Sequence, residues 1–268
     1  MAQTSQIEWT DQTWNPTTGC DKVSAGCKFC YAELMAERLV RMGSARYDNG
    51  FKLTLHEDKI EEPLTWRKPR KVFVNSMSDL FHEQVDLEFL RRVFDVMQRT
   101  PRHTYQILTK RPERMAGLLS ELERQGDYVP APHIWLGTSV EDELVLSRVS
   151  WLKQVPAQVR FLSCEPLLGP LGPDLDLTDI HWVIAGGESG LHLFQESSRQ
   201  RRALVDYAKG VWTPRPERIA WVRQLRDVCA RQEVAYFFKQ WGGSTPKAAG
   251  RLLDGAHWDQ YPKPSQTS

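Results

Sequence analysis

The chain has 268 residues, of which 41% are hydrophobic and 26% are charged, proportions that indicate a folded globular protein and exclude a disordered, collagen-like or disulfide-dense chain. Lysine and arginine number 35 against 34 acidic residues, so the overall charge does not predict a polyanionic partner, and a nucleic acid would need a local basic patch. A membrane-spanning helix needs about eighteen consecutive apolar residues, and no apolar run in the chain is that long. Residues 1–9 lack the basic and apolar regions of a secretory signal. We therefore expect a cytoplasmic protein with reduced cysteines and no membrane contact.

Short apolar runs alternate with helical patterns along the chain. We predict strands at residues 71–76, 104–109, 134–139, 159–163, 182–185 and 235–239, with a seventh at 13–17. Helices are predicted between them at residues 89–97, 112–124, through 144–145, and at 217–232. This alternation indicates a parallel sheet, and an open or closed β/α barrel fits it better than two separate domains. We expect a single domain over residues 1–262, with an insertion at 191–216 and a frayed tail at 263–268.

The five cysteines are unevenly distributed. Cys20, Cys27 and Cys30 lie close together in the pattern C-x6-C-x2-C, whereas Cys164 and Cys229 are isolated. An odd, clustered set in a reducing compartment favours metal binding or catalysis over a disulfide framework. A structural zinc site would need a fourth ligand from elsewhere, and a catalytic metal with three protein ligands would keep one open position. A [4Fe–4S] cluster on three cysteines would likewise leave one iron free, and the spacing alone does not choose between zinc and iron–sulfur.

Polar and charged residues follow each predicted strand. In β/α barrels the carboxyl ends of the strands carry the chemistry, and here they hold residues 76–79, 109–111, 139–142, 164–166, 186–189 and 239–241. Helix capping accounts for serines in such positions. It does not account for Lys110, Arg111 or Lys239, because a cation at a helix start opposes the helix dipole. These cations therefore indicate an anionic group at the strand ends.

The cysteine loop and the barrel rhythm together resemble the radical S-adenosylmethionine (radical SAM) superfamily. Within it, the chain is similar to an uncharacterised family associated with phages and prophages. The likeness extends over nearly the whole length and rests on the cysteine loop and on residues 14–16, 74–81, 108–112, 135–137, 165–169, 186–190 and 238–242. The resemblance implies an α/β fold, a partial or near-complete (β/α) TIM-like barrel of the radical SAM type, with the cysteine loop after the first strand.

The resemblance also implies the cofactors and the chemistry. A [4Fe–4S] cluster would be bound by Cys20, Cys27 and Cys30, with SAM on the free iron. An external electron donor of the flavodoxin or ferredoxin type would supply one electron. SAM would then be cleaved to methionine and a 5′-deoxyadenosyl radical, which removes a hydrogen from the substrate.

Candidate cofactor contacts follow from the resemblance and from the strand ends. Phe29 matches the aromatic residue that usually lies near the adenine of SAM. The SAM amino group is expected at Ser76, Ser78 or Asp79, and the ribose and carboxylate at Glu141 and Lys110. The remaining strand-end candidates are Ser139 for cofactor binding and Glu165, Glu188, Lys239 and Trp241 for substrate binding.

Two features depart from the superfamily pattern. Its commonest cysteine spacing is C-x3-C-x2-C, whereas the first gap here is six residues. Its GGE motif follows the second strand, a position held here by residues 76–79, so we do not transfer that role to Glu188.

The expected substrate is a nucleic-acid base, by analogy with the lyase that repairs thymine dimers in spores and because of the phage association. Two alternatives stay open. One is a radical enzyme that modifies a peptide or a metabolite. The other is a non-enzymatic zinc protein that binds nucleic acid through the basic stretches 66–71 and 199–209. We expect Cys164 and Cys229 to be dispensable for the cluster, although Cys164 is placed where it could contact substrate.

Overall fold

The computed structural model describes residue 5 and residues 7–263. It divides into two compact units. The first unit contains Met1–Thr138 and Trp151–Val159, and the second contains Ser139–Ser150 and Arg160–Ser268. Apart from Lys263, the tail expected at 263–268 lies outside the described residues. Among the described residues, no helix has the length and apolar character needed to cross a membrane.

Four strands of the first unit form a parallel set with a buried apolar core. They pair in the order β1-β4-β5-β6. In the register, Val74 lies opposite Trp14 on one side and Ile107 on the other, and all three side chains are at most 1% exposed. The predicted strands are thus confirmed with slightly different ends: β1 (Gln12–Trp14), β4 (Lys71–Val74), β5 (Thr104–Thr109) and β6 (Ile134–Ser139).

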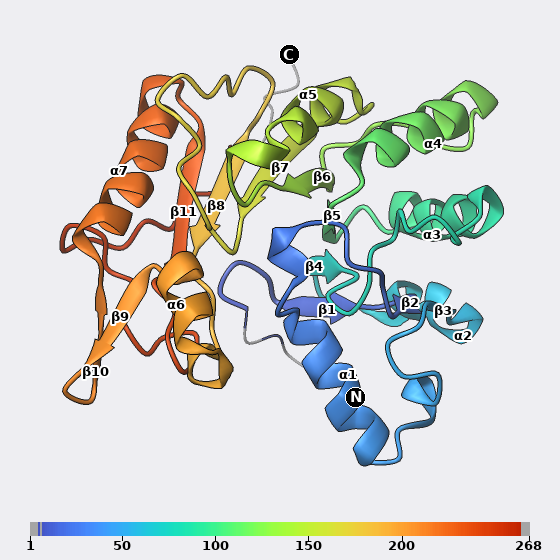
Figure 1. The fold of residues 1–268 in the computed structure, drawn as a ribbon. Coiled ribbons are helices and arrows are strands. Elements are labelled where there is room, and N and C mark those ends of the chain that lie inside the picture. The colour runs from blue at the N-terminus through green and yellow to red at the C-terminus, as the bar shows by residue number, and fades with distance from the viewer. Residues whose placement is uncertain (1–4, 6, 264–268) are drawn as a thin grey trace. The chain divides into compact units, whose positions relative to one another are not determined.

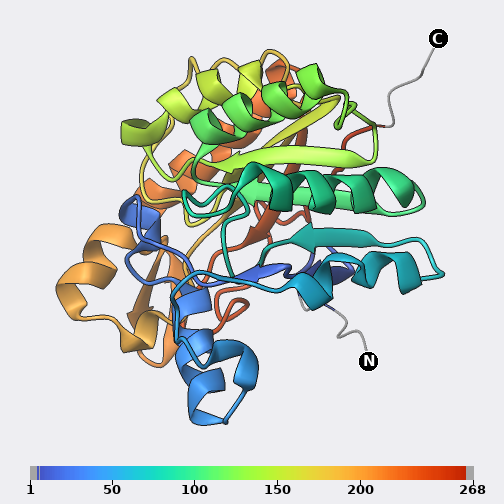
Figure 2. The ribbon, with the colours of Figure 1, turned by 90° about the vertical axis from the view of Figure 1, so that its right-hand side faces the viewer.

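The two long helices of the first unit follow their sequence signals. At the start of α3 (Leu87–Arg99), the Asp86 carboxylate accepts a hydrogen bond from the Phe89 N–H at 2.7 Å, and the apolar residues at helical spacing are buried. Helix α4 (Pro112–Gln125) begins with proline in its first turn and ends at Gly126, whose φ of 81° suits a glycine C-cap. The two helices lie side by side (Figures 1 and 2). The shorter elements are α1 (Tyr31–Arg41), α2 (Glu57–Ile60), and the antiparallel pair β2 (Thr17–Thr18) and β3 (Thr54–Leu55).

The second unit also contains parallel strands. They are β7 (Val159–Cys164), β8 (Trp182–Gly186) and β11 (Ala235–Gln240), and β8 lies between the other two. All five residues of β8 are buried, as expected for a central strand with an unbroken apolar run. The predicted helix at 217–232 is α7 (Pro216–Arg231). The helix expected through residues 144 and 145 is a 3-10 turn, Glu143–Val145, followed by α5 (Ser147–Gln154).

The stretch 191–216, expected to be an inserted loop or helix, contains a hairpin in addition to a helix. After a short 3-10 turn, Leu191–Leu193, come α6 (Glu196–Arg202), β9 (Val205–Ala208) and β10 (Val211–Pro214). The two-residue turn has φ values of 50° at Lys209 and 84° at Gly210, the combination that a type I′ hairpin requires. The hairpin was not predicted because lysine is not a typical first residue of such a turn.

We expect Gly187→Ala to destabilise the protein and Gly117→Ala to stabilise it. A Cβ at Gly187 would lie 2.1 Å from the Trp241 carbonyl oxygen, so the backbone would have to shift, at a cost of about 1–3 kcal/mol. Gly117 lies within α4 with open space around its Cα, and alanine there should add about 0.5–1 kcal/mol. Urea unfolding of both variants measures the difference. Equal free energies of unfolding would contradict the close packing at Gly187.

Candidate active site

The start of the three-cysteine loop, residues 19–30, is joined to the segment that follows β4. The Gly19 N–H donates to the Met77 carbonyl at 3.0 Å, and the Ser78 hydroxyl donates to the Gly19 carbonyl at 2.6 Å. Gly19 has a φ of 81°, and a Cβ there would lie 2.1 Å from the Lys52 carbonyl oxygen. Only glycine fits at this position, and it places Cys20 beside the carboxyl end of β4.

Arg111, two residues after β5, links Cys20 to Asp79. One guanidinium nitrogen, Nη1, lies 3.6 Å from the Cys20 Sγ and 3.1 Å from the Asp79 Oδ2. The other terminal nitrogen, Nη2, lies 3.5 Å from the Asp21 carbonyl oxygen. Burial raises the pKa of the Cys20 thiol to about 11; the charge of Asp79 adds to this shift, and Arg111 partly offsets it. A thiol with so high a pKa is neutral at physiological pH unless a metal ion binds it and displaces the proton.

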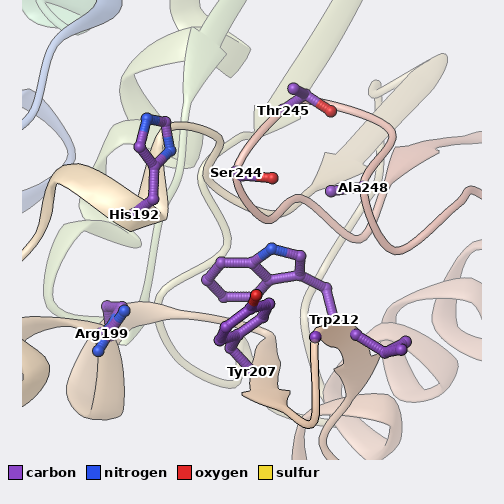
Figure 3. Close-up of a pocket in the computed structure, with 9 residues that line it drawn as sticks. His192, Arg199, Tyr207, Trp212, Ser244, Thr245 and Ala248 are labelled. Carbon is purple, nitrogen blue, oxygen red and sulfur yellow. The ribbon is translucent and has the colours of Figure 1, made fainter.

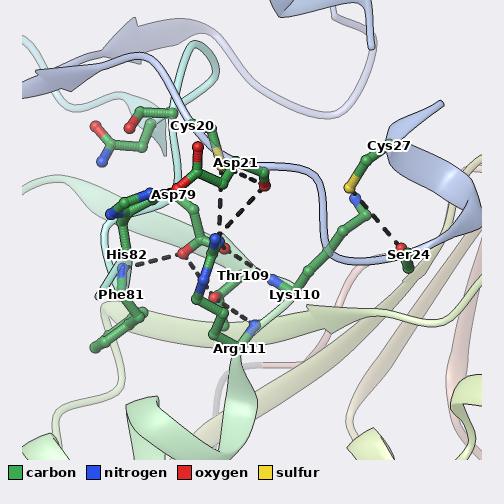
Figure 4. Close-up of polar contacts among 12 residues, drawn as sticks. Cys20, Asp21, Ser24, Cys27, Asp79, Phe81, His82, Thr109, Lys110 and Arg111 are labelled. Atoms are coloured by element: carbon green, nitrogen blue, oxygen red, sulfur yellow. Dashed lines mark hydrogen bonds and ion pairs between the residues drawn. The ribbon is translucent and has the colours of Figure 1, made fainter. Parts of the chain in front are cut away.

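Asp79 is the centre of this network. Its side chain is 8% exposed, and its two oxygens accept four hydrogen bonds. The backbone N–H of Phe81 and the Thr109 hydroxyl donate to Oδ1 at 3.0 and 2.7 Å. The Lys110 N–H and Arg111 donate to Oδ2, both at 3.1 Å. The carboxylate thereby ties the ends of β4 and β5 together, and Figure 4 shows these contacts around it.

Cys27 and Cys30 lie in a less constrained part of the loop. Cys27 ends a 3-10 turn, with its Sγ 3.9 Å from the Ser24 hydroxyl, and Cys30 immediately precedes α1. In Figure 4 the Lys110 side chain runs toward Cys27. All three cysteines of the loop are free thiols and partly exposed. The structure places them on one loop.

The three cysteine thiols of this loop are its possible metal ligands. Within residue 5 and residues 7–263, no three His, Cys, Asp or Glu side chains are grouped closely enough to hold a metal ion, so a metal would bind here only if the loop drew its thiols together. Three thiols on one loop are the soft ligands that iron–sulfur clusters and zinc both accept. The donor set therefore fits a cluster.

The other candidates of the first unit gather near Cys20. The Ser76 hydroxyl donates to the Asn15 Oδ1 at 3.2 Å, and the Ser76 carbonyl accepts from the Tyr31 hydroxyl. Ser78 contacts Gly19, as described above. Phe29 is half-buried, with the Lys28 Nζ 5.4 Å from its ring centroid. The structure thus brings Ser76, Ser78 and Asp79 to one segment beside Cys20.

Sequence reasoning missed two asparagines in this region. The Asn15 Oδ1 also accepts from the Met77 N–H at 3.1 Å, so it fixes the segment after β4. Asn75 has a φ of 64°, and its side-chain amide donates to the Thr17 hydroxyl at 2.7 Å. Its Oδ1 is buried and has no hydrogen-bond partner among the described residues, so an acceptor remains there for a ligand. Both asparagines directly follow an observed strand, β1 or β4, but lie inside the strands predicted at 13–17 and 71–76, so the sequence did not mark them as strand-end residues.

The strand ends of the second unit form ion pairs of their own. Glu165, after β7, and Lys239, in β11, meet at 2.8 Å between Oε2 and Nζ. Gly186 of the intervening β8 leaves room for this pair, because a Cβ there would lie 3.4 Å from the Glu165 side chain. Glu188 pairs with Arg202 through two contacts, of 2.9 and 2.5 Å. A third pair joins Glu141 and Arg148 at 2.8 Å.

Three strand-end residues of the second unit are buried. Trp241 is 3% exposed, its indole N–H donates to the Leu252 carbonyl at 2.8 Å, and its ring packs on Phe238. Ser139 is 1% exposed, and its carbonyl accepts from Arg148 at 2.9 Å. Cys164 is fully buried, and this burial raises its pKa well above the ordinary value. A neutral core thiol of this kind is inert.

The basic stretch 66–71 is partly engaged in the fold. Trp66 is 6% exposed, and the Arg70 guanidinium lies 5.5 Å from the centroid of its ring. Arg70 also donates to the Gln12 side chain at 2.8 Å. Part of this stretch therefore packs and bonds within the first unit.

Comparison with known proteins gives one family and a group of solved structures. The profile of the family described as "Protein of unknown function (DUF5131)" matches residues 4–209 and 209–262. None of the curated proteins matches the chain.

The solved structures show the fold. The chain is similar to spore photoproduct lyase complexed with dinucleoside spore photoproduct, with a TM-score of 0.53, 12% identity, and coverage of 89% of this chain and 78% of that chain. It is also similar to a mutant of spore photoproduct lyase with bound AdoMet and dinucleoside spore photoproduct, with a TM-score of 0.53, 11% identity, and coverage of 90% and 79%. The predicted fold class, an α/β partial barrel of the radical SAM type, is confirmed by this likeness.

We expect Asp79→Ala to destabilise the protein by about 3–5 kcal/mol, because it leaves Arg111 buried without its ion-pair partner. As a matched control, Asp95→Ala on α3 removes an exposed pair with Arg99 and should change the free energy of unfolding by less than about 0.5 kcal/mol. Chemical denaturation of the two variants gives both values. A cost for Asp79→Ala as small as that of the control would show that the network around Asp79 does not hold the strand ends.

Proposed function

We propose that this chain, which belongs to the family described as "Protein of unknown function (DUF5131)", is a radical SAM enzyme that acts on a nucleic-acid base. One observation carries the proposal. Cys20 is attached to the carboxyl ends of β4 and β5 in a chain that has the fold of spore photoproduct lyase. Enzymes built on β/α barrels assemble their active sites at these strand ends. A three-cysteine loop held there is suited to a catalytic cofactor.

Cys20, Cys27 and Cys30 would hold a [4Fe–4S] cluster. The chemistry that a bound cluster would supply is the one-electron reductive cleavage of SAM to methionine and a 5′-deoxyadenosyl radical for hydrogen abstraction, with the electron coming from an external flavodoxin- or ferredoxin-type donor. Arg111 donates to the Cys20 sulfur and so would stabilise that sulfur as a thiolate. Asp79 holds the Arg111 guanidinium in place, which makes it a positioning residue.

The geometry ranks the candidates for the SAM amino group. Asp79 already accepts four hydrogen bonds from the protein. The hydroxyls of Ser76 and Ser78 each donate to a protein oxygen and keep lone pairs that can accept from an ammonium group. We therefore propose the two serines for the amino group and Lys110 for the SAM carboxylate. The remaining proposed cofactor contacts are Phe29 in the first unit and Ser139 and Glu141 in the second.

The proposed substrate is a base of a nucleic acid. Support comes from the solved relatives, whose bound ligands are a dinucleoside photoproduct and AdoMet. In the second unit, Glu165, Glu188 and Lys239 are the proposed substrate contacts, and the buried Trp241 would support them by packing. We further propose that the enzyme works in the cytoplasm, where its thiols stay reduced. The association with phages stays a prediction.

The first experiment tests the cluster. Protein reconstituted anaerobically with iron and sulfide should be brown, with about four irons per chain and a broad absorption band near ~400 nm. Cys27→Ala should lose the band and most of the iron, because a ligand is removed, whereas the control Cys229→Ala should keep both. Circular dichroism should show that both variants are folded. A colourless protein with one tightly bound zinc would instead support the alternative, a non-enzymatic zinc protein.

The second experiment tests the chemistry. The reconstituted protein, given dithionite and SAM under anaerobic conditions, should release 5′-deoxyadenosine and methionine, which liquid chromatography measures. Cys27→Ala should release neither above background. Turnover with DNA, RNA and peptides in deuterated buffer then identifies the substrate class by deuterium incorporation. Cluster-loaded protein that leaves SAM intact would rule out radical SAM activity, and deuterium in peptides alone would rule out the nucleic-acid substrate.

A further inference from the structure

The second unit contains a cavity that no step of the proposed chemistry uses. Its volume is about 530 Å³, a size typical of ligand sites. Its walls come from the 191–216 stretch, including the β9–β10 hairpin, and from a loop that follows β11. Figure 3 shows its lining residues, which are His192, Arg199, Tyr207, Gly210, Val211, Trp212, Ser244, Thr245 and Ala248.

Two aromatic rings form one wall of the cavity. Tyr207 of β9 and Trp212 of β10 are register partners, and their ring centroids are 4.8 Å apart. Trp212 packs close to Gly243, where a Cβ would lie only 3.1 Å from the indole Cγ. Tyr207 is 56% exposed although it is a large aromatic residue. The hairpin therefore presents an aromatic surface formed by the paired rings of Tyr207 and Trp212.

The remaining walls supply a guanidinium group, an imidazole and two hydroxyl groups. His192 and Arg199 stand on one side, and Ser244 and Thr245 on another (Figure 3). Arg199 pairs with Glu196 on the same helix, but the Glu196 side chain is 68% exposed. Exposed pairs of this kind contribute little, so a phosphate can replace the carboxylate.

The charge of the surrounding stretch is also positive. Residues 191–216 contain five lysines and arginines against two acidic residues, whereas the chain as a whole is nearly neutral. The second acidic residue, Asp206, is paired with Arg215 at 2.6 Å. Arg199, Arg202 and Arg215 are in ion pairs, and Arg202 and Arg215 are buried, so the exposed Arg201 and Lys209 carry the excess positive charge of the stretch, which favours contact with a polyanion.

We infer that this cavity binds an unpaired nucleotide of a nucleic-acid strand. The base would stack on Tyr207 and Trp212, because aromatic rings bind any base through its π-face. Arg199 and His192 would contact the adjoining phosphate, and the hydroxyls of Ser244 and Thr245 can donate to or accept from the base edge. Bases stacked within a duplex cannot offer a face to these rings, so the site selects unpaired nucleotides. The inference concerns binding alone and does not require a cluster or SAM.

Fluorescence anisotropy of the purified full chain tests this inference. The probes are a fluorescein-labelled oligothymidylate of about twelve nucleotides, its uridine counterpart, and an abasic strand of the same length. Wild type should bind both base-bearing strands, DNA and RNA, about tenfold more tightly than the abasic strand, because only the bases can stack. Competition by unlabelled duplex should be weak.

Substitutions at the aromatic wall test whether the oligonucleotide binds in this cavity. Tyr207→Ala and Trp212→Ala should each remove most of the preference for the base-bearing strands, whereas Trp212→Phe should keep a large part of it. Leu193→Ala is the matched control, since Leu193 is 65% exposed in the same stretch but does not line the cavity. Tyr207→Ala keeps the test valid if Trp212→Ala fails to fold. Equal binding of abasic and base-bearing strands by wild type, or an unchanged preference in Tyr207→Ala, would overturn the inference. Because no reductant or SAM is present, this result is independent of the turnover experiment.

Discussion

The buried contact between Asp79 and Arg111 is the interaction on which the proposed site depends. A buried carboxylate and guanidinium are costly to desolvate, so they persist only where further hydrogen bonds satisfy both groups. Asp79 meets this condition with two backbone amides and the Thr109 hydroxyl. The terminal nitrogens of Arg111 reach Cys20 and the carbonyl of Asp21, and its buried Nε has no hydrogen-bond partner among the described residues. One ion pair thus joins the ends of two neighbouring strands to the first cysteine of the loop. The position of Cys20 is therefore set by the sheet.

Ion pairs of this kind account for two of the three cations at the predicted strand ends. Their position at helix starts opposes the helix dipole, which led us to expect an anionic ligand. For Arg111 and Lys239, the structure shows that a carboxylate of the protein provides the compensating charge: Asp79 at the end of β4 and Glu165 at the end of β7. The sequence indicated a need for negative charge but could not show its source, because each carboxylate lies on another strand end, far away in the chain. Lys110 is the remaining strand-end cation, and its role stays a proposal.

The sequence predicted some features of the fold and missed others, and each outcome has a physical reason. The strands and long helices were found because a buried strand needs an unbroken apolar run and an amphipathic helix needs apolar residues at helical spacing. The fold class followed from their alternation, and the cysteine loop from its spacing. The β9–β10 hairpin was missed because its strands lie largely on the surface and show no apolar run, and because its turn contains Lys209 before Gly210. Asn15 and Asn75 were missed because their contacts depend on register, which no local pattern reveals.

The loop of residues 19–30 combines a fixed end with a less constrained one, and this asymmetry suits a metal site. Cys20 is held by Arg111 and by the contacts of Gly19, whereas Cys27 contacts only a nearby serine among the hydrogen bonds described here. In the proposed site, metal binding would supply the free energy that draws the other two thiols toward the first, and this ordering would couple binding to local folding. The raised pKa of Cys20 would add to the free-energy cost of metal binding, since a metal must displace the thiol proton. A fixed first ligand would reduce the conformational entropy that the loop loses on closing. The loop would then need to order only residues 21–30 around the cluster, while the sheet keeps the site in place.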